Sequence, residues 1–281
     1  MSPAGRGQSI ADADRDVRQY LVRVAAAMGE VLSEKLSGLY IHGSLATGSF
    51  HRERSDIDLI AVSNSKLTPG WRETVARTLV NLSDARPTKG DIEVNVVQER
   101  YARAFEHPLP YEVHYSSRYH EDIRHGRIDF EADRTNVDLA ANLMEARERG
   151  VTLVGPSAQV MFGPVPWHAY INALEADFNW ARPLVTEMPV YAVLSACRIL
   201  HGATSRSLSV LNKDEAASWA LETVPRMYHS IINDALQLYR GTKSIDDVVL
   251  VERDIIAFRE YVRERSAPAF ARASDTGEED E

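Results

Sequence analysis

The sequence predicts an α+β protein in which a domain with a mixed β-sheet precedes an all-helical bundle domain. In the first hundred residues, apolar side chains recur alternately with the period of a helix and with the period of a strand. Beyond Trp167, every strong apolar pattern has the helical period. We therefore place the domains at residues 10–155 and 156–266, and we expect disordered tails at 1–9 and 267–281.

The N-terminal domain is expected to run helix, strand, tight turn, strand, helix, strand. Its helices span 10–36 and 68–82, and the second starts at Thr68-Pro69, a typical helix start. Its strands span 39–41, 57–62 and 91–98, where apolar and polar residues alternate. Residues 136–149 form a further helix that Gly150 ends, and the proline-rich stretch 151–166 is typical of a connection between domains.

In the C-terminal domain, helices are predicted at 167–180, 189–200, 213–221, 225–239 and 249–263. Asn212 and Glu215 have the spacing of a capping box at the start of the third. Cys197, the only cysteine, lies within an apolar helical pattern, which predicts a buried thiol and excludes an intrachain disulfide.

The formal net charge of −9 argues against nucleic acid as a partner, because binding a phosphate backbone requires a basic surface. Five acidic side chains lie between Asp275 and Glu281, which favours a solvated tail. Residues 1–9 lack the apolar core of a signal peptide, and no stretch approaches the ~18 consecutive apolar residues of a membrane span. We expect a cytoplasmic monomer that binds neither membranes nor nucleic acid.

One motif indicates the chemistry. Gly43-Ser44 follow an apolar strand, and Ser55-Asp56-Ile57-Asp58 open the next. Alternate residues of a strand share a face, so Asp56 and Asp58 point the same way, with Cα atoms roughly 6.5 Å apart. Two carboxylates at that spacing suit hard divalent cations, and a glycine turn lets backbone N–H groups approach a phosphate. The motif therefore indicates metal-assisted transfer of a nucleotide.

Asp91 and Glu93 bring a third carboxylate from the next predicted strand. If that strand pairs with the strand of Asp58, Glu93 lies near both aspartates, because cross-strand neighbours are only ~5 Å apart. Three close carboxylates repel one another unless cations neutralise them. Asp91 shares the face of Glu93 and lies at the solvated start of the strand. His42 is interpreted as a structural residue.

These residues resemble the signature of the DNA polymerase β-like nucleotidyltransferase superfamily. More narrowly, the chain is similar to the streptomycin/spectinomycin adenylyltransferases, which are aminoglycoside O-nucleotidyltransferases with a helical C-terminal domain. The motifs that narrow the resemblance are Val154-Gly155-Pro156, Phe162-Gly163-Pro164-Val165-Pro166 and Lys213-Asp214-Glu215-Ala216-Ala217-Ser218-Trp219-Ala220. The resemblance spans residues 30–265 and implies a polymerase β-like nucleotidyltransferase domain followed by a helical bundle.

By this resemblance, the enzyme moves AMP from ATP to a hydroxyl of a small cationic aminoglycoside or aminocyclitol antibiotic, and so confers resistance. Asp56, Asp58 and Glu93 would hold two Mg²⁺ ions, and Glu93 would also be the catalytic base. Asp91 is the alternative base, and we favour Glu93 because Asp91 lies at the solvated start of the strand. The residues that the resemblance assigns to ATP are Ser44, Ser55, Asp138, Arg198, Lys213 and Tyr239.

The antibiotic is expected to contact Arg118 and Glu187. Family members that accept streptomycin carry a tryptophan where this chain has Arg118, and an aspartate where it has Met188, beside Glu187. An arginine facing a cationic drug is unfavourable, so the resemblance favours spectinomycin over streptomycin. Two alternatives stay open, namely transfer to a protein or another metabolite, and a nucleotide-binding regulator without catalytic activity.

Overall fold

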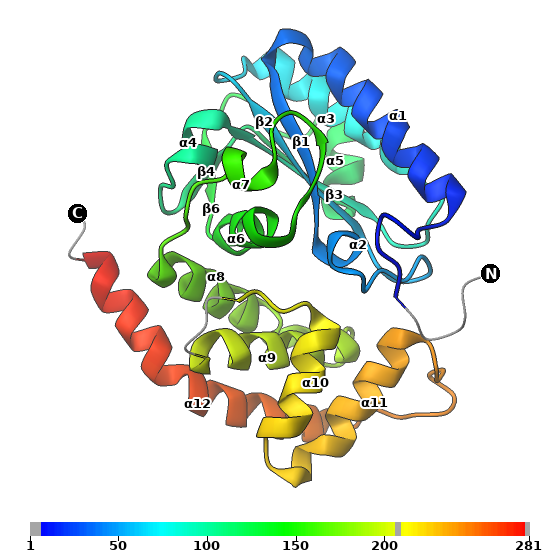
Figure 1. Cartoon of the computed structure of the whole chain (residues 1–281), viewed down its shortest axis with the longest axis vertical. Helices are drawn as coiled ribbons and strands as arrows, with labels where there is room; N and C mark the ends of the chain where they lie inside the picture. The colour runs from blue at the N-terminus through cyan, green and yellow to red at the C-terminus, as the bar shows by residue number, and fades with distance from the viewer. Residues whose placement is uncertain (1–6, 206–208, 279–281) are drawn as a thin grey trace. The chain divides into compact units, whose positions relative to one another are not determined.

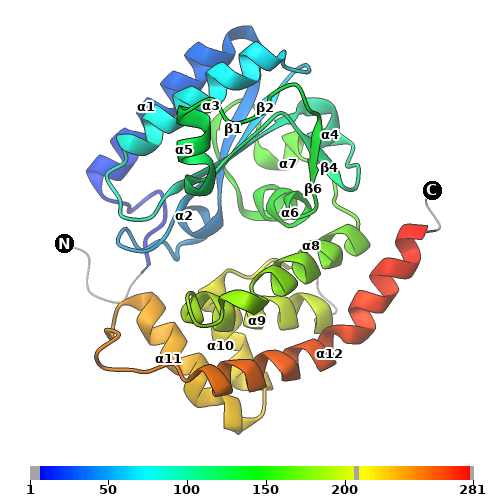
Figure 2. The ribbon, with the colours of Figure 1, turned by 180° about the vertical axis from the view of Figure 1, so that it is seen from behind.

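The computed structural model describes residues 7–205 and 209–278 (Figures 1 and 2), and the chain forms two compact units. One unit runs from Gln8 to Val165, and the other consists mainly of the chain from Pro166 onward. The chain thus changes unit at Pro166, whereas the sequence placed the domain boundary at 156. The predicted α+β class is confirmed, because the first unit contains a mixed sheet and the second consists of helices. Within the described ranges, no helix is both long and apolar enough to cross a membrane.

The first unit is built around a five-stranded sheet in the order β5-β3-β2-β1-β7, beside which β4 and β6 form a separate pair. In the five-stranded sheet, β2 and β3 run parallel and the other pairings are antiparallel. The strands are β1 (Leu36–His42), β2 (Ile57–Ser63), β3 (Ile92–Gln98), β4 (Leu109–Tyr111), β5 (Val113–Tyr115), β6 (Arg134–Asn136) and β7 (Val151–Val154). The helices are α1 (Arg15–Leu32), α2 (Gly43–Thr47), α3 (Pro69–Asp84), α4 (Glu99–Arg103), α5 (His120–Arg124), α6 (Leu139–Arg149) and α7 (Ala158–Met161), with 3-10 turns η1 (Ser33–Lys35) and η2 (Ser117–Tyr119).

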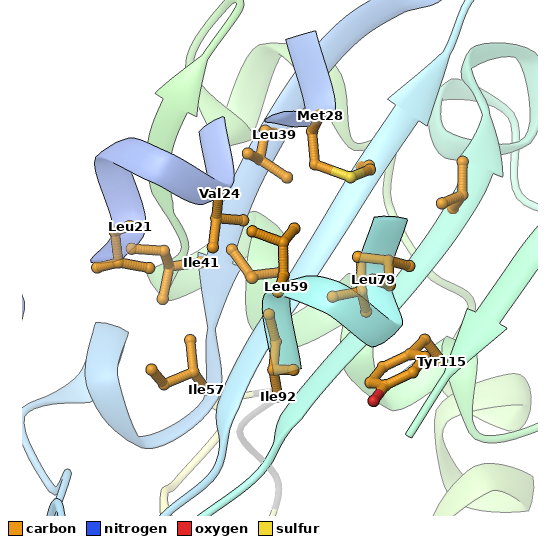
Figure 3. Packing of buried hydrophobic residues seen from close by; sticks show 14 of the residues in the cluster. Leu21, Val24, Met28, Leu39, Ile41, Ile57, Leu59, Leu79, Ile92 and Tyr115 are labelled. Atoms are coloured by element: carbon orange, nitrogen blue, oxygen red, sulfur yellow. The ribbon is translucent and has the colours of Figure 1, made fainter. Parts of the chain in front are cut away.

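One face of this sheet packs against α1 and α3 and forms the core of the unit (Figure 3). Successive residues of a strand point to opposite faces, so the apolar residues at alternate positions share this face. The core residues that Figure 3 labels are Leu21, Val24, Met28, Leu39, Ile41, Ile57, Leu59, Leu79, Ile92 and Tyr115. The residues at the intervening strand positions point to the other face, where α6 contacts β1.

Two parts of the predicted connection at 151–166 are regular structure. Residues 151–154 pair with β1 as strand β7, and residues 158–161 form the short helix α7. The half-buried Val151, Leu153 and Val154 pack against the core, and burial of this apolar surface explains why the segment joins the sheet. Helix α6 begins at Leu139 rather than 136, because residues 134–136 pair with β4 as β6.

The helical unit contains α8 (Trp167–Trp180), η3 (Arg182–Leu184), α9 (Pro189–Thr204), α10 (Lys213–Thr223), η4 (Arg226–Tyr228), α11 (His229–Arg240) and α12 (Glu252–Glu278). Helix α9 is central, because α8, α10, α11 and α12 all pack against it. Its Cys197 is buried, as predicted. The capping box of Asn212 and Glu215 is confirmed at the start of α10, and Gly241 ends α11 with φ +70°.

Both predicted tails are partly ordered. Helix α12 continues through residues 267–278, because the buried Ala269, Phe270 and Ala273 extend the helical spacing set by Phe258 and Val262. These apolar residues outweigh the acidic composition of the end of the chain. Near the N-terminus, Gln8 forms a β-bridge with Phe50. Residues 1–6 and 279–281 lie outside the described ranges.

Candidate active site

Three polar side chains lie side by side on neighbouring strands: His42 on β1, Asp58 on β2 and Glu93 on β3. His42 is opposite Asp58 in the antiparallel β1–β2 pair, and Asp58 is opposite Glu93 in the parallel β2–β3 pair. The predicted pairing of the strands of Asp58 and Glu93 is therefore confirmed. The adjacent Ile57 and Ile92 point into the core (Figure 3), so the two carboxylates point to the opposite face of the sheet.

Gly43 allows the Asp58 carboxylate to lie against the backbone of the turn. Gly43 has φ +68°, a conformation that glycine adopts without strain. A Cβ atom at this position would lie 2.0 Å from Oδ2 of Asp58. Any side chain here would therefore displace the carboxylate.

Ser44 and Ser55 both precede Asp58 in the sequence and differ in their hydrogen bonding. Ser44 Oγ is buried and has no hydrogen-bond partner among the described residues. Ser55 is buried, and its Oγ accepts a hydrogen bond of 3.0 Å from the backbone N–H of His51. Buried hydroxyls normally have a partner, so Ser44 Oγ is available to a ligand.

Asp56 and Asp91 are held at the starts of the two parallel strands. Asp56 lies directly before β2, and its Oδ1 accepts a hydrogen bond of 2.7 Å from the backbone N–H of Asp91. The Asp91 carboxylate forms an ion pair with Arg86 at 2.9 Å. Of the two carboxylates considered as a base, Asp91 is thus paired with an arginine, whereas Glu93 lies beside Asp58.

The surroundings of Glu93 raise its pKa to about 7. Burial is the largest cause, and the negative charge of Asp58 is the next; His42 acts in the opposite direction, and Asp56 and Asp138 add smaller increases. Asp138, which is exposed and directly precedes α6, is therefore within electrostatic range of Glu93. A carboxyl group with a pKa near neutrality is suited to proton transfer at physiological pH.

His42 connects the carboxylates to α6. Its Nδ1 lies 3.4 Å from Oε2 of Glu145, and both residues are buried. Burial lowers the pKa of His42, but the hydrogen bond to Glu145 and the charges of Asp58 and Glu93 raise it by more, so that the net shift is upward. From the sequence, His42 was interpreted as structural, and Glu145 was not considered. The place of His42 next to Gly43 was a signal that it lies near the site, whereas no motif in the sequence points to Glu145.

In the helical unit, the structure links two of the residues assigned to ATP. Lys213 Nζ lies 4.3 Å from the ring centroid of Tyr191, whose hydroxyl donates a hydrogen bond of 2.5 Å to Asp177. The other oxygen of Asp177 pairs with Arg198 at 3.4 Å. Tyr191 and Asp177 thus connect Lys213 with Arg198, and sequence reasoning found neither. Tyr239 is half-buried near the end of α11.

The two residues expected to contact the antibiotic are both exposed. Arg118 lies in η2 of the first unit, and Glu187 precedes α9 in the helical unit. Burial and then the charge of Arg118 lower the pKa of His114 to about 4. His114 lines a small hollow at the β5 edge of the sheet, together with Tyr119, Arg72 and others, but none of the predicted site residues lines it.

The oxygen donors around Asp58 fit a divalent cation that a substrate helps to hold. Asp56, Asp58 and Glu93 offer carboxylate oxygens, and the negative charges of Asp58 and Asp56, which after burial raise the pKa of Glu93, are charges that a cation would neutralise. In the described part of the chain, no three His, Cys, Asp or Glu side chains form a group able to hold a metal ion. Mg²⁺ usually binds one or two carboxylates together with substrate phosphates, so this arrangement suits it.

Comparisons with known proteins agree with this geometry. The family described as "Nucleotidyltransferase domain" matches residues 28–131, and "Aminoglycoside adenylyltransferase, C-terminal domain" matches residues 160–265. An aminoglycoside (3'') (9) adenylyltransferase from Shigella flexneri is 31% identical over 237 residues, covering 80% of this chain and 86% of the relative. The chain belongs to the aminoglycoside adenylyltransferase family.

Other members are more distant. A spectinomycin 9-adenylyltransferase from Staphylococcus aureus is 23% identical over 219 residues, covering 75% of this chain and 81% of the relative. The crystal structure of a spectinomycin adenyltransferase from Enterococcus faecialis, with ATP and spectinomycin, has the same fold, with a TM-score of 0.76 at 19% identity. That likeness covers 89% of this chain and 99% of the solved one. The chain is therefore an aminoglycoside adenylyltransferase-like enzyme, as the resemblance implied.

Proposed function

We propose that this adenylyltransferase transfers AMP from Mg–ATP to a hydroxyl of spectinomycin in the cytoplasm, and thereby confers resistance. The observation that carries the proposal is the register of β2 and β3, in which Glu93 is the neighbour of Asp58. A carboxylate pair of this kind can combine cation binding with removal of a proton from the acceptor. The ion pair of Asp91 with Arg86 supports Glu93 as the base.

In this reaction, Glu93 takes the proton of the acceptor hydroxyl, whose oxygen attacks the α-phosphorus of ATP. The bond from that phosphorus to the pyrophosphate oxygen breaks, and AMP stays on the acceptor. Asp56, Asp58 and Glu93 would hold Mg²⁺. When bound, Mg²⁺ would polarise the α-phosphate and offset the charge of the leaving pyrophosphate.

The remaining residues assigned to ATP have suitable chemistry. Ser44 Oγ offers a hydrogen bond to the triphosphate, since its Oγ has no partner within the described ranges. Ser55 directly precedes Asp56 in the sequence, and Asp138 lies within electrostatic range of Glu93. Lys213 occupies the first position of α10, where a cation opposes the helix dipole, and this unfavourable placement supports a role in binding an anion. We assign Arg198 and Tyr239 to the nucleotide as well.

Spectinomycin is proposed over streptomycin because of the exposed Arg118. A guanidinium group that faces a cationic drug repels it, and the drug with more positive charge is disfavoured more. Glu187 offers the opposite charge and is proposed as an antibiotic contact.

The proposal is tested by mass spectrometry of spectinomycin and streptomycin after incubation with the protein, ATP and Mg²⁺. We expect spectinomycin to gain the mass of AMP and streptomycin to stay unmodified. Expression in a sensitive bacterium should raise the inhibitory concentration of spectinomycin alone. If pyrophosphate forms without either drug being modified, the acceptor is another molecule; if ATP binds and no pyrophosphate forms with any acceptor, the protein is a nucleotide-binding regulator.

A further inference from the structure

We infer that His42 is a positioning residue for the carboxylates of Asp58 and Glu93, and that Glu145 fixes its ring. The inference rests on the proposed use of these carboxylates in binding Mg–ATP. His42 would not touch the substrates itself but would act by orienting the two carboxylates.

His42 occupies the boundary between the sheet and the turn that precedes Ser44. It is the last residue of β1 and lies opposite Asp58, and its exposed fraction is 5%. On its other side, Nδ1 meets Oε2 of Glu145 at 3.4 Å, and Glu145 is 8% exposed. The ring therefore bridges α6 and the carboxylate face of the sheet.

The hydrogen bonding of the second ring nitrogen distinguishes a positioning role of His42 from a purely structural one. Nε2 of His42 is buried, yet it meets no hydrogen-bond partner in the described chain. A buried polar atom without a partner lowers stability, so an apolar ring would be the better choice if position 42 served packing alone. Because the contact with Glu145 fixes Nδ1, it also fixes the direction of Nε2. The charges of Asp58 and Glu93 both act on His42, so one of these carboxylates is the proposed partner of Nε2 in the Mg–ATP complex.

The Asp58 carboxylate lies between Gly43 and Glu93. It fills the space that a side chain at position 43 would occupy, and its negative charge acts on Glu93. Side chains that bind metals are normally oriented by hydrogen bonds from a second layer of residues, and removal of that layer typically costs about 10–100-fold in metal affinity or activity. His42 and Glu145 have the burial and the position of such a layer.

The test uses three substitutions that separate the two nitrogens. In His42→Gln, the amide nitrogen reaches roughly the place of Nε2; in His42→Asn, it lies near the place of Nδ1; His42→Phe keeps the ring and removes both. Ser63→Ala is the control, because it removes a buried hydroxyl that donates to Val97 O at 3.4 Å at the other end of β2. Calorimetry measures ATP binding in the absence of antibiotic as Mg²⁺ is titrated, and thermal melts confirm folding.

We expect His42→Phe and His42→Asn to raise the Mg²⁺ concentration for half-maximal ATP binding by about 10-fold or more, while thermal melts show that both variants are folded. His42→Gln should stay nearer to wild type, and Ser63→Ala should match it. The inference is overturned if His42→Phe binds with the wild-type Mg²⁺ dependence, if Asn substitutes better than Gln, or if the wild-type protein shows no Mg²⁺-dependent ATP binding. Because no drug is present, failure of spectinomycin to be modified contradicts only the proposed acceptor.

Discussion

Replacement of Gly43 by alanine tests the geometry of the site most directly. The added Cβ would lie 2.0 Å from Oδ2 of Asp58, whereas an ordinary contact is at least 3.4 Å, so the carboxylate has to move by about 1.4 Å. A displacement of about 1 Å in a catalytic group can cost about 100-fold in rate. The φ of +68° adds about 1–2 kcal/mol of backbone strain in alanine. We expect kcat/KM for pyrophosphate release with spectinomycin to fall by about 100-fold or more.

Gly48→Ala is the matched control for this variant. Gly48 has φ +84°, so alanine suffers similar backbone strain, but a Cβ there meets no described atom within 4 Å. We expect the two variants to lose similar amounts of stability in thermal melts, while Gly48→Ala keeps nearly full turnover. The reasoning is refuted if Gly43→Ala turns over like the wild type, or if Gly48→Ala loses as much activity as Gly43→Ala.

Three further variants test the remaining features. Glu93→Gln should lower kcat by about 10²–10⁴-fold and retain ATP binding by calorimetry, and near wild-type turnover would remove Glu93 from the mechanism. In protein free of metal and nucleotide, folded Glu93 with a pKa of about 7 retains a proton that the unfolded chain loses near 4.5, so this group lowers stability as the pH rises through that window. Melts in EDTA at about pH 5 and about pH 8 should therefore show a smaller loss of stability in Glu93→Gln than in the wild type, and equal losses would contradict the pKa assignment. Glu112→Ala removes the buried partner of Arg72 at 2.9 Å and leaves the exposed Asp133 as its remaining carboxylate, so it should cost more than about 1 kcal/mol in denaturant unfolding; Lys66→Ala, which breaks an exposed pair with Asp133, should cost less than about 1 kcal/mol.

The parts of the fold that depend on local periodicity could be predicted from the sequence. The alternation in β2 and β3 gives the facing of Asp58 and Glu93, because the period of a strand is a local property. The capping box of α10 is equally local. The direction in which strands pair depends on contacts between distant segments. The sequence alone therefore did not reveal that β2 and β3 run parallel or that β7 joins the sheet beside β1.

The supporting contacts of the candidate site escaped prediction for the same reason. Glu145 follows His42 by 103 residues and is marked by no motif of its own. Tyr191 and Asp177, which connect Lys213 with Arg198, lie on different helices and acquire their role only through the packing of α8, α9 and α10. The end of α12 was missed because composition was weighed above the continued spacing of its buried residues.

The register of β2 and β3 has a consequence for folding fidelity. A slip of one residue would turn Glu93 inward, among Leu59, Leu79 and the other apolar side chains of Figure 3, and would expose Ile92 and Val94. Such a misaligned sheet would bury a carboxylate in hydrocarbon, which is costly enough to make it unstable. Chains in which Asp58 and Glu93 are mispaired would therefore also fail to form a stable core, so that packing of the hydrophobic interior selects the correct pairing of the two carboxylates.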